Sequence, residues 1–264
     1  MIFSFSYSRD IVKAQEAEFL EVCKKRAAEG AGKIDVVDIN KAKKQVEVKE
    51  IFSLGEVIEG LKEKFPGLVH MRVPVCNSAS PLEVDFDIIC QTLVGTAINT
   101  PVIVSDQVGL SRATTGSVIA CLFKEWQISA SFEGLVETVP GVNPTLLKMD
   151  TYKMDMEKDA LKRGDFEVVK KLMVALPDGV AAKNVCDKVI DKNGTPKTGG
   201  TGIKQLRENI AESKLSYEIM DDSAQLFLKS KIMDNIQKYN YLICFAAYLR
   251  SVEEAARYEI NIMC

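Results

Sequence analysis

Hydrophobic and polar residues alternate over short stretches in the first half of the chain, and between these stretches apolar residues recur every three or four positions. A period of two is typical of β-strands, whereas the longer period is typical of amphipathic helices. Strands are expected at residues 34–39, 46–51, 69–75 and 101–105, and helices at residues 8–28, after Ser53, after Ser80 and at 114–126. Because strands and helices alternate, the pattern predicts an α/β fold with a mostly parallel central sheet flanked by helices.

The second half of the chain shows helical spacing only. Apolar residues follow the helical period over residues 165–176, 180–192, 203–217 and 223–249. We therefore expect an α/β core over residues 1–163, shortened at its start, and an all-helical C-terminal part over residues 164–264 that packs on the same domain. A glycine-rich stretch at residues 193–202 is no nucleotide-binding loop, because no strand precedes it and no Gly-Lys-Ser/Thr ends it.

Composition narrows the class of protein without naming a function. Hydrophobic residues make up 47% and charged residues 27% of the sequence, with a net charge of −3, which favours a globular protein over a nucleic-acid or anionic-membrane binder. The seven cysteines show no paired spacing and no secretory signal is expected, so the sequence indicates reduced thiols in the cytoplasm. The longest apolar run, residues 241–249, is too short to span a membrane.

The inventory of side chains also limits the chemistry. His70 is the single histidine, which argues against histidine-based zinc sites and Ser-His-Asp triads. Two sets of residues are expected to be ordinary core: the cysteines on apolar helix faces and an aromatic stripe on the last helix. They are Cys90, Cys121, Cys186 and Cys244, and Tyr239, Tyr241, Phe245 and Tyr248.

The segment around residues 101–126 has the organisation of a phosphate-binding loop. An apolar strand leads into Asp106, a glycine-containing loop and Arg112, and a helix follows. Cysteine-dependent phosphatases hold phosphate in this way, since backbone N–H groups and the helix dipole converge on the anion. Their attacking thiolate stands six residues before the arginine, and here that position is Asp106. The candidate remnant of the anion-binding loop is Gln107, Val108, Gly109, Leu110, Ser111 and Arg112.

Residues 99–122 resemble the signature of the paladin family, relatives of the cysteine-dependent, phytase-like phosphatases. The family pattern reads Cys-Gln, a glycine-rich turn and Arg-Thr-Thr-Thr-Gly, and this protein reads Asp-Gln-Val-Gly-Leu-Ser-Arg-Ala-Thr-Thr-Gly. The resemblance extends over residues 49–250, through the segments 71–75, 80–81, 85–87, 164–169, 187–192, 205–208 and 241–245. Paladins carry such units in tandem, and the sequence resembles one degenerate unit with a shortened start. The resemblance implies a protein-tyrosine-phosphatase-like fold.

Two departures from the family pattern bear on catalysis. The nucleophile position is Asp106, and the family's Val-Thr-Asp, whose aspartate resembles a general acid, reads Val75-Cys76-Asn77. An amide has no proton to give to a leaving group. Aspartate can attack phosphate in another phosphatase class, but that class uses magnesium and a second aspartate two residues on, where Val108 stands. We therefore expect no catalytic residue, with Asp106, Asn77 and Arg112 at degenerate positions.

The charge of Asp106 is expected to exclude phosphate. At about 4 Å, one charge repels another by about 1 kcal/mol in water and by about 4 kcal/mol near a protein surface. We expect Asp106 to stay ionised beside Arg112 and to pair with it, taking over the backbone contacts of the phosphate. We therefore expect Arg112 to be a structural residue that connects its loop to the sheet, in preference to a ligand-binding residue.

The leading interpretation is a catalytically inactive phosphatase-like domain that serves as a protein-interaction or structural component of a larger assembly. A cytoskeletal or ciliary assembly is one such setting, although no residue points to it. No cofactor, metal, nucleic acid or membrane span is expected, and protein partners are expected instead of a phosphorylated ligand. Two alternatives stay open: a reader of inositol phosphates or phosphopeptides that does not hydrolyse them, and a residual inositol phosphate or phosphoinositide phosphatase.

Overall fold

The computed structural model describes residues 2–6, 9–37, 41–75, 79–106, 112–131, 160–194 and 206–262. At its centre three short strands form one sheet, in the order β4 (His70–Pro74), β1 (Ile2–Ser6) and β5 (Ile103–Ser105). Both β4 and β5 run parallel to β1, with Ile2 opposite His70 on one side and Ile103 on the other. The carboxyl ends of β4 and β5 therefore lie at the same edge of the sheet, where binding sites of open α/β sheets form.

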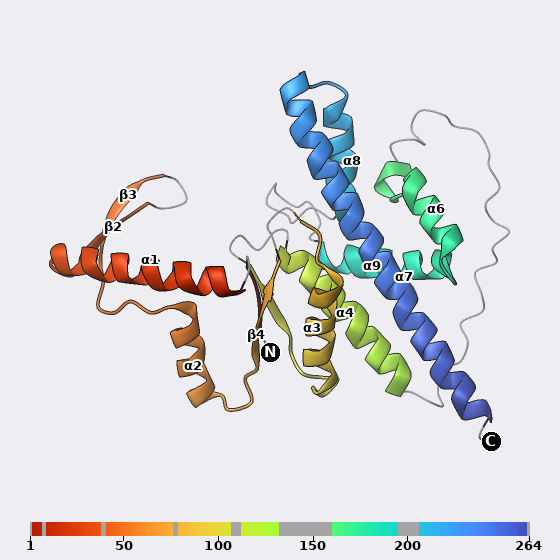
Figure 1. The fold of residues 1–264 in the computed structure, drawn as a ribbon, viewed down its shortest axis with the longest axis horizontal. Coiled ribbons are helices and arrows are strands. Elements are labelled where there is room, and N and C mark those ends of the chain that lie inside the picture. Colours follow the sequence, from red (N-terminus) through yellow and green to blue (C-terminus); the bar gives the residue numbers. More distant parts are fainter. Residues whose placement is uncertain are drawn as a thin grey trace.

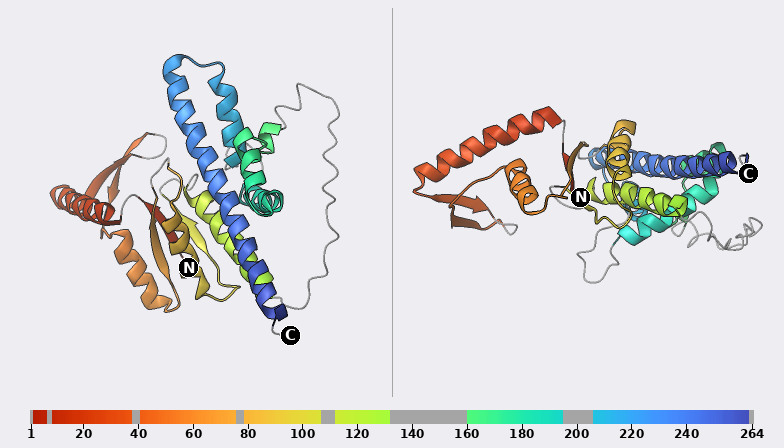
Figure 2. Two further views of the ribbon diagram at one scale, coloured as in Figure 1. Left: turned by 45° about the vertical axis from the view of Figure 1, so that its right-hand side comes forward. Right: turned by 90° about the horizontal axis from the view of Figure 1, so that it is seen from below.

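An N-terminal lobe extends to one side of this sheet (Figures 1 and 2). It contains α1 (Arg9–Glu29), the antiparallel hairpin of β2 (Lys33–Val37) and β3 (Lys43–Glu47), and α2 (Leu54–Lys64). The Arg72 guanidinium donates to both carboxylate oxygens of Glu16, at 3.0 and 2.7 Å, and so ties α1 to β4. This ion pair fixes the lobe to the sheet.

The expected capping box at the start of α2 is present. Glu56 donates its backbone N–H to Ser53 Oγ at 3.1 Å, and the Glu56 carboxylate accepts the backbone N–H of Ser53 at 2.6 Å. The two residues thus satisfy each other's free N–H groups at the helix end. Local sequence signals are sufficient to place this helix start.

On the other side of the sheet, the described residues form a body of helices: α3 (Glu83–Val94), α4 (Arg112–Ser131), α6 (Glu167–Ala175), α7 (Gly179–Asn193), α8 (Leu206–Tyr217) and α9 (Asp222–Ile262). The helix α4 contacts α3, α7 and α9, and α9 also runs beside α8 (Figure 2). One hydrophobic cluster joins these helices to β4; its fully buried members include Val73, Ile89, Ile119, Val189, Ile210 and Leu242. This core therefore holds α4, α9 and the end of β4 together.

The prediction of a mixed α/β fold with a helical C-terminal part is confirmed, but the expected sheet was too large. Residues 33–47 form a separate antiparallel hairpin, and the described part of the protein is mostly helical. The strand β1 was not predicted. It is the central strand of the three-stranded sheet, between β4 and β5. A run of five residues is too short for its hydrophobic pattern to distinguish a strand from the segment that precedes a helix. Such a strand forms because it pairs with strands that are distant in the sequence. The helix α9 also continues to Ile262, past the expected end at residue 249.

Candidate functional site: a phosphatase-like loop with an internal carboxylate

The strand before Asp106 and the helix that begins at Arg112 lie where the sequence predicts them. The strand β5 ends at Ser105, Asp106 follows, and α4 begins at Arg112. The expected anion loop, Gln107, Val108, Gly109, Leu110 and Ser111, lies outside the described residues, as do Cys76, Asn77 and Ser78. The geometry of the site is therefore given by the residues on either side of the loop, at the carboxyl ends of β4 and β5 and the start of α4.

The Asp106 carboxylate contacts the start of α4. Its Oδ2 accepts the backbone N–H of Ala113 at 2.9 Å, and its side chain is only 3% exposed. The first N–H groups of a helix have no partner within the helix and carry partial positive charge, so they bind anions. In this protein, the carboxylate of an aspartate side chain binds one of them.

Arg112 faces the same carboxylate and also reaches the sheet. Its Nε lies 4.0 Å from Asp106 Oδ2, which confirms the expected pairing as a long ion pair, and its side chain is 5% exposed. Its Nη1 donates to the carbonyl oxygen of Val75, just after β4, at 3.4 Å. Its Nε is buried and has no hydrogen-bond partner among the described residues. Arg112 therefore ties the start of α4 to β4, as the sequence predicts, without using all of its donors.

Lys238, on α9, brings a second cation to this site. The residue is 5% exposed and lines a narrow gap, too small to hold a water molecule, with Arg112, Thr115, Val75, Ala79 and Pro81. Within the described parts of the protein, no hydrogen bond or ion pair reaches its ammonium group. Burial lowers the pKa of Lys238; Arg112 lowers it further, and Asp234 opposes the shift.

Sequence reasoning missed Lys238, because it lies 126 residues after Arg112 and belongs to no local motif. The one available signal is its place on α9. Leu242 and Phe245, four and seven residues later, lie on the same helical face and are buried. A lysine on a face that is otherwise buried is uncommon, because an unpaired charge is costly to remove from water.

A second buried polar cluster lies nearby on α7, α8 and α9. The Lys183 ammonium donates to Asp187 Oδ2 and to the Arg163 carbonyl oxygen, both at 2.8 Å. Tyr239 Oη donates to Asp187 Oδ1 at 2.6 Å, and Arg207 Nη1 lies 3.5 Å from Asp187 Oδ2. Arg207 also pairs with Asp191. Burial and the Asp187 carboxylate raise the pKa of Tyr239, so this phenol stays protonated and the cluster is structural.

Three of the described cysteines have thiols whose burial disfavours the thiolate. Burial raises the pKa of Cys90 to about 12 and also raises the pKa of Cys186 and Cys244. A reactive cysteine requires a lowered pKa, since the thiolate is the attacking species. The expectation that Cys121 is a core residue was wrong, because it is exposed on α4. The prediction that the aromatic residues of the last helix are core is confirmed for Tyr239, which is buried, and wrong for Tyr248, which is 62% exposed.

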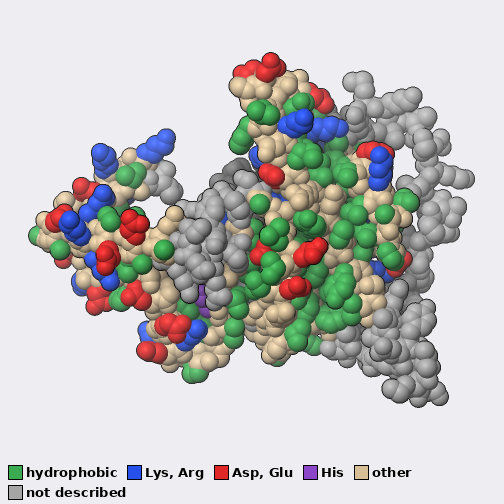
Figure 3. Space-filling view, viewed as in Figure 1, with side chains coloured by type: hydrophobic (Ala, Val, Ile, Leu, Met, Phe, Trp, Pro, Cys, Tyr) green, Lys and Arg blue, Asp and Glu red, His purple; other side chains and the backbone are tan. Residues whose placement is uncertain are grey.

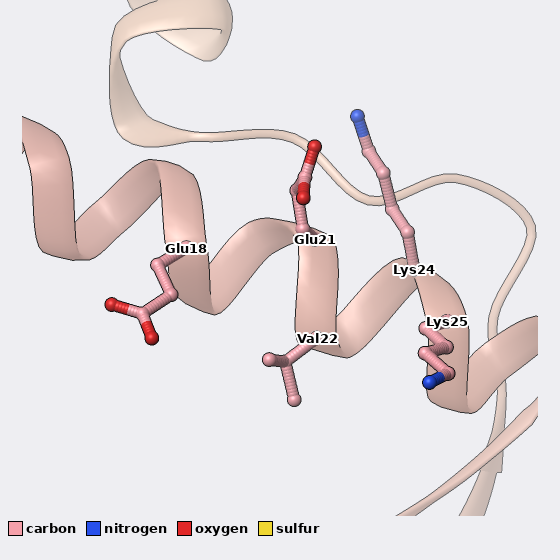
Figure 4. Close-up of a pocket in the computed structure, with 5 residues that line it drawn as sticks. All are labelled: Glu18, Glu21, Val22, Lys24 and Lys25. Carbon is pink, nitrogen blue, oxygen red and sulfur yellow. The ribbon is translucent and has the colours of Figure 1, made fainter.

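The remaining surface of the described residues shows no second centre of chemistry. A shallow groove along α1 is lined by five residues of that one helix, whose charged side chains point in different directions: Glu18, Glu21, Val22, Lys24 and Lys25 (Figure 4). Over the described ranges, no three metal-ligating side chains come together. Likewise, none of the helices in the part of the sequence that was searched has the length and apolarity to cross a bilayer.

Comparisons with known proteins agree with the phosphatase-like geometry. Residues 6–124, which include Asp106 and Arg112, match the PTP-like phytase family, whose description names inositol hexakisphosphate. Paladin of Xenopus tropicalis is 26% identical over 204 residues, covering 75% of this protein and 21% of that relative. Paladin of Mus musculus is 30% identical over 192 residues, covering 70% of this protein and 20% of that relative. The sequence thus spans about a fifth of the length of these relatives. No solved structure matches it.

Proposed function

We propose that this protein, which has a PTP-like phytase domain and is a distant homologue of the paladins, is a catalytically inactive phosphatase-like unit that works by binding proteins. It serves as an interaction or structural component of a larger assembly. The observation that carries this proposal is the contact of the Asp106 carboxylate with the Ala113 N–H at the start of α4, opposite Arg112.

This contact supports inactivity in two ways. It places an aspartate carboxylate on an N–H group that a phosphatase-like loop offers to its substrate. It also places a negative charge where a phosphate oxygen would bind. Like charges about 4 Å apart repel by about 4 kcal/mol at an effective dielectric constant of about 20. Asp106 therefore takes the position of a bound phosphate, and a phosphate has to compete with this carboxylate for Arg112 and for the N-terminus of α4.

The other reacting role is also missing from the sequence. Asn77 stands where the family resemblance places a general acid, and an amide cannot protonate a leaving oxygen. The buried thiols with raised pKa values do not replace the missing nucleophile. Loss of nucleophile and acid on a scaffold that keeps its arginine favours a non-catalytic role.

The surface is suited to binding other proteins. Hydrophobic side chains gather on the body, and large apolar residues are also exposed on the lobe and at the α8–α9 turn (Figure 3). Among them are Phe19, Phe52, Ile219, Leu226 and Phe227, each more than half exposed. Clusters of exposed apolar residues mark interaction sites in many proteins. The free cysteines are consistent with a reducing cytoplasm as the place of action.

Restoring the two missing groups tests this proposal. The purified protein is expected to release no p-nitrophenol from p-nitrophenyl phosphate, whereas the double variant Asp106→Cys, Asn77→Asp is expected to gain measurable turnover. The single variant Asp106→Cys separates the two roles, since it restores the nucleophile alone. Turnover by the unaltered protein that disappears in Asp106→Ala would refute inactivity.

A reader of phosphorylated ligands is the second candidate, and one observation favours it: Lys238 adds a buried cation beside Arg112. Calorimetric titration with inositol polyphosphates measures this directly. Micromolar binding that is lost in Arg112→Ala supports the reader, and its absence leaves the protein-binding role.

A further inference from the structure

We propose that the protein associates with a second copy of itself through the outer edge of β3, so that the two β2–β3 hairpins form one four-stranded antiparallel sheet. The hairpin belongs to the N-terminal lobe and lies away from the body of helices (Figure 1). This surface is separate from the site of Asp106 and Arg112. The proposal goes beyond the proposed function and does not depend on it.

The hairpin has little around it within one copy of the protein. Every residue of β3 is exposed, and Ile34 is the one residue of β2 that is partly buried. Among the described residues, β2 and β3 pair only with each other, and α1 contacts β2. A two-stranded hairpin is at best marginally stable in water, whereas three or more strands with an apolar face are stable. The exposed Val36 and Val46 are therefore suited to a wider sheet.

The backbone of β3 presents every second residue to the open edge. Val48 donates its N–H to the Gly32 carbonyl oxygen at 2.7 Å, and the register places these two residues opposite each other. Hydrogen-bonded pairs alternate with non-bonded pairs along an antiparallel ladder, so residues 44 and 46 also bond to β2. The N–H and C=O groups of the other three residues of β3 therefore point away from β2, toward the open edge: Lys43, Gln45 and Glu47.

The side chains of these three residues complement a second copy of themselves. Gln45 is the central residue of β3, with Lys43 two positions before it and Glu47 two positions after it. When two β3 strands pair antiparallel about Gln45, each Lys43 lies opposite the Glu47 of the other copy. Opposite charges in such cross-strand pairs are stabilising. Within the described residues, neither Lys43 nor Glu47 already has an ion pair.

The charges also select this one register. Lysine on an edge strand normally discourages pairing with other chains, and Glu47 offsets Lys43 only when the second copy is aligned about Gln45. The resulting pair is closed by a two-fold axis, which is the commonest symmetry of protein dimers. A second copy of the protein therefore fits this edge better than an unrelated strand does.

The outer edge of β2 is less suited to the same pairing. Its central residue is Asp35, so two β2 strands paired antiparallel place two carboxylates opposite each other, and like charges there are destabilising. The Lys33 N–H is also already bound to the Gly30 carbonyl oxygen at 3.1 Å. This contrast identifies β3 as the strand that pairs.

Sedimentation velocity of the purified protein over a range of concentrations measures the association. The paired strands are short, so the interface is small and a dissociation constant of about 1–100 µM is expected for the dimer. The backbone N–H groups of Lys43, Gln45 and Glu47 become bonded in the dimer, so their hydrogen exchange should slow as the concentration rises. A protein that stays monomeric well above this range overturns the proposal, as does unchanged exchange at these three residues.

Charge reversals then test the register. Lys43→Glu and Glu47→Lys each turn two attractive pairs into two repulsive ones, so each should weaken the dimer by about tenfold or more. Mixing the two single variants should restore association, because each carboxylate then faces an ammonium group. The double variant Lys43→Glu, Glu47→Lys should restore it for the same reason. The controls Lys25→Glu and Glu21→Lys make the same changes at exposed positions of α1 and should leave the dimer unchanged.

Two results of this series overturn the proposal. One is equal association of the parent protein and both single reversals, which is also the result expected if another surface, such as the α8–α9 turn, forms the dimer. The other is a mixture or a double variant that associates no more strongly than the single variants. Neither result affects the proposed inactivity, because only turnover by the unaltered protein refutes that.

Discussion

Two buried polar clusters meet α9 through adjacent residues, and they differ in whether each cation has a carboxylate partner. Tyr239 belongs to the cluster of Lys183, Asp187 and Arg207, in which Asp187 has partners on α7, α8 and α9. Lys238 belongs to the cluster at the start of α4, where Arg112 Nε and the lysine ammonium lack acceptors among the described residues. Each cluster leaves one buried guanidinium Nε of the described residues without a hydrogen-bond partner, that of Arg207 in the first and that of Arg112 in the second. In the first cluster both cations have carboxylate partners, whereas in the second the described residues give Arg112 one ion pair, with Asp106, and Lys238 none.

This difference separates structure from function. Buried cations with carboxylate partners fix helices relative to one another, whereas a buried cation without such a partner costs stability. The two clusters are close enough for the first to position the second, because Tyr239 anchors the turn of α9 that carries Lys238. Substitutions in the two clusters are therefore expected to change stability in opposite directions.

The largest effect is expected in the cluster around Asp187. Asp187→Ala removes the shared acceptor of Lys183, Arg207 and Tyr239, leaving two buried cations without this counter-charge. Breaking a buried ion network from one side costs about 3–5 kcal/mol, so the free energy of unfolding should fall by that amount in urea denaturation. Glu125→Ala is the control, since its ion pair with Lys192 is exposed and such pairs contribute about 1 kcal/mol or less. A loss in Asp187→Ala no larger than in the control would contradict the structural role.

A smaller loss is expected from the backbone beneath the same cluster. Gly164 has a φ of 74°, and a Cβ there would lie 2.7 Å from Tyr239 Oη and 3.0 Å from Arg207 Cδ. Gly164→Ala combines left-handed strain with a displaced tyrosine, and we expect a loss of about 2–3 kcal/mol, measured by thermal unfolding.

The matched control for this glycine is on α2. Gly60 lies within the helix and has open space around the position of a Cβ. Gly60→Ala should therefore raise the free energy of unfolding by about 0.5–1 kcal/mol. If both alanine variants gained stability, the close approach of Gly164 to Tyr239 would not be present in solution.

The smallest change is expected at Lys238, and it is a gain in stability. Lys238→Met replaces an unpaired buried cation with an apolar side chain of similar length, which should add about 1 kcal/mol to the free energy of unfolding at neutral pH. Lys231→Met should stay within about 0.5 kcal/mol of the parent protein. Destabilisation by Lys238→Met would show that the ammonium is already paired.

The pH dependence of that gain follows from the direction of the pKa shift. Burial lowers the pKa of Lys238 in the folded protein below its ordinary value of 10.5. The folded state therefore binds this proton less readily than the unfolded state, and the cost is fully present at neutral pH. The cost disappears as the pH rises through the folded and then the ordinary pKa, so the gap between Lys238→Met and the parent protein should narrow.

What could be predicted from the sequence was local. The capping box of Ser53 and Glu56 and the pairing of Asp106 with Arg112 involve residues three and six positions apart, and both are present. The strand β1 and the residue Lys238 were missed for one reason. Each is defined by contacts with segments far away in the sequence, β4 and β5 for the strand and the end of β4 and the start of α4 for the lysine. No pattern within a short window carries that information.

The most direct test of the central claim compares the affinity for inorganic phosphate of the parent protein and of Asp106→Asn. The substitution keeps an oxygen for the Ala113 N–H and removes only the charge. Removing a repulsion of about 1–4 kcal/mol should tighten phosphate binding by about fivefold or more in calorimetric titration, through Arg112. Equal affinities, or tight binding of phosphate by the parent protein, would contradict the account that the Asp106 carboxylate fills the cradle.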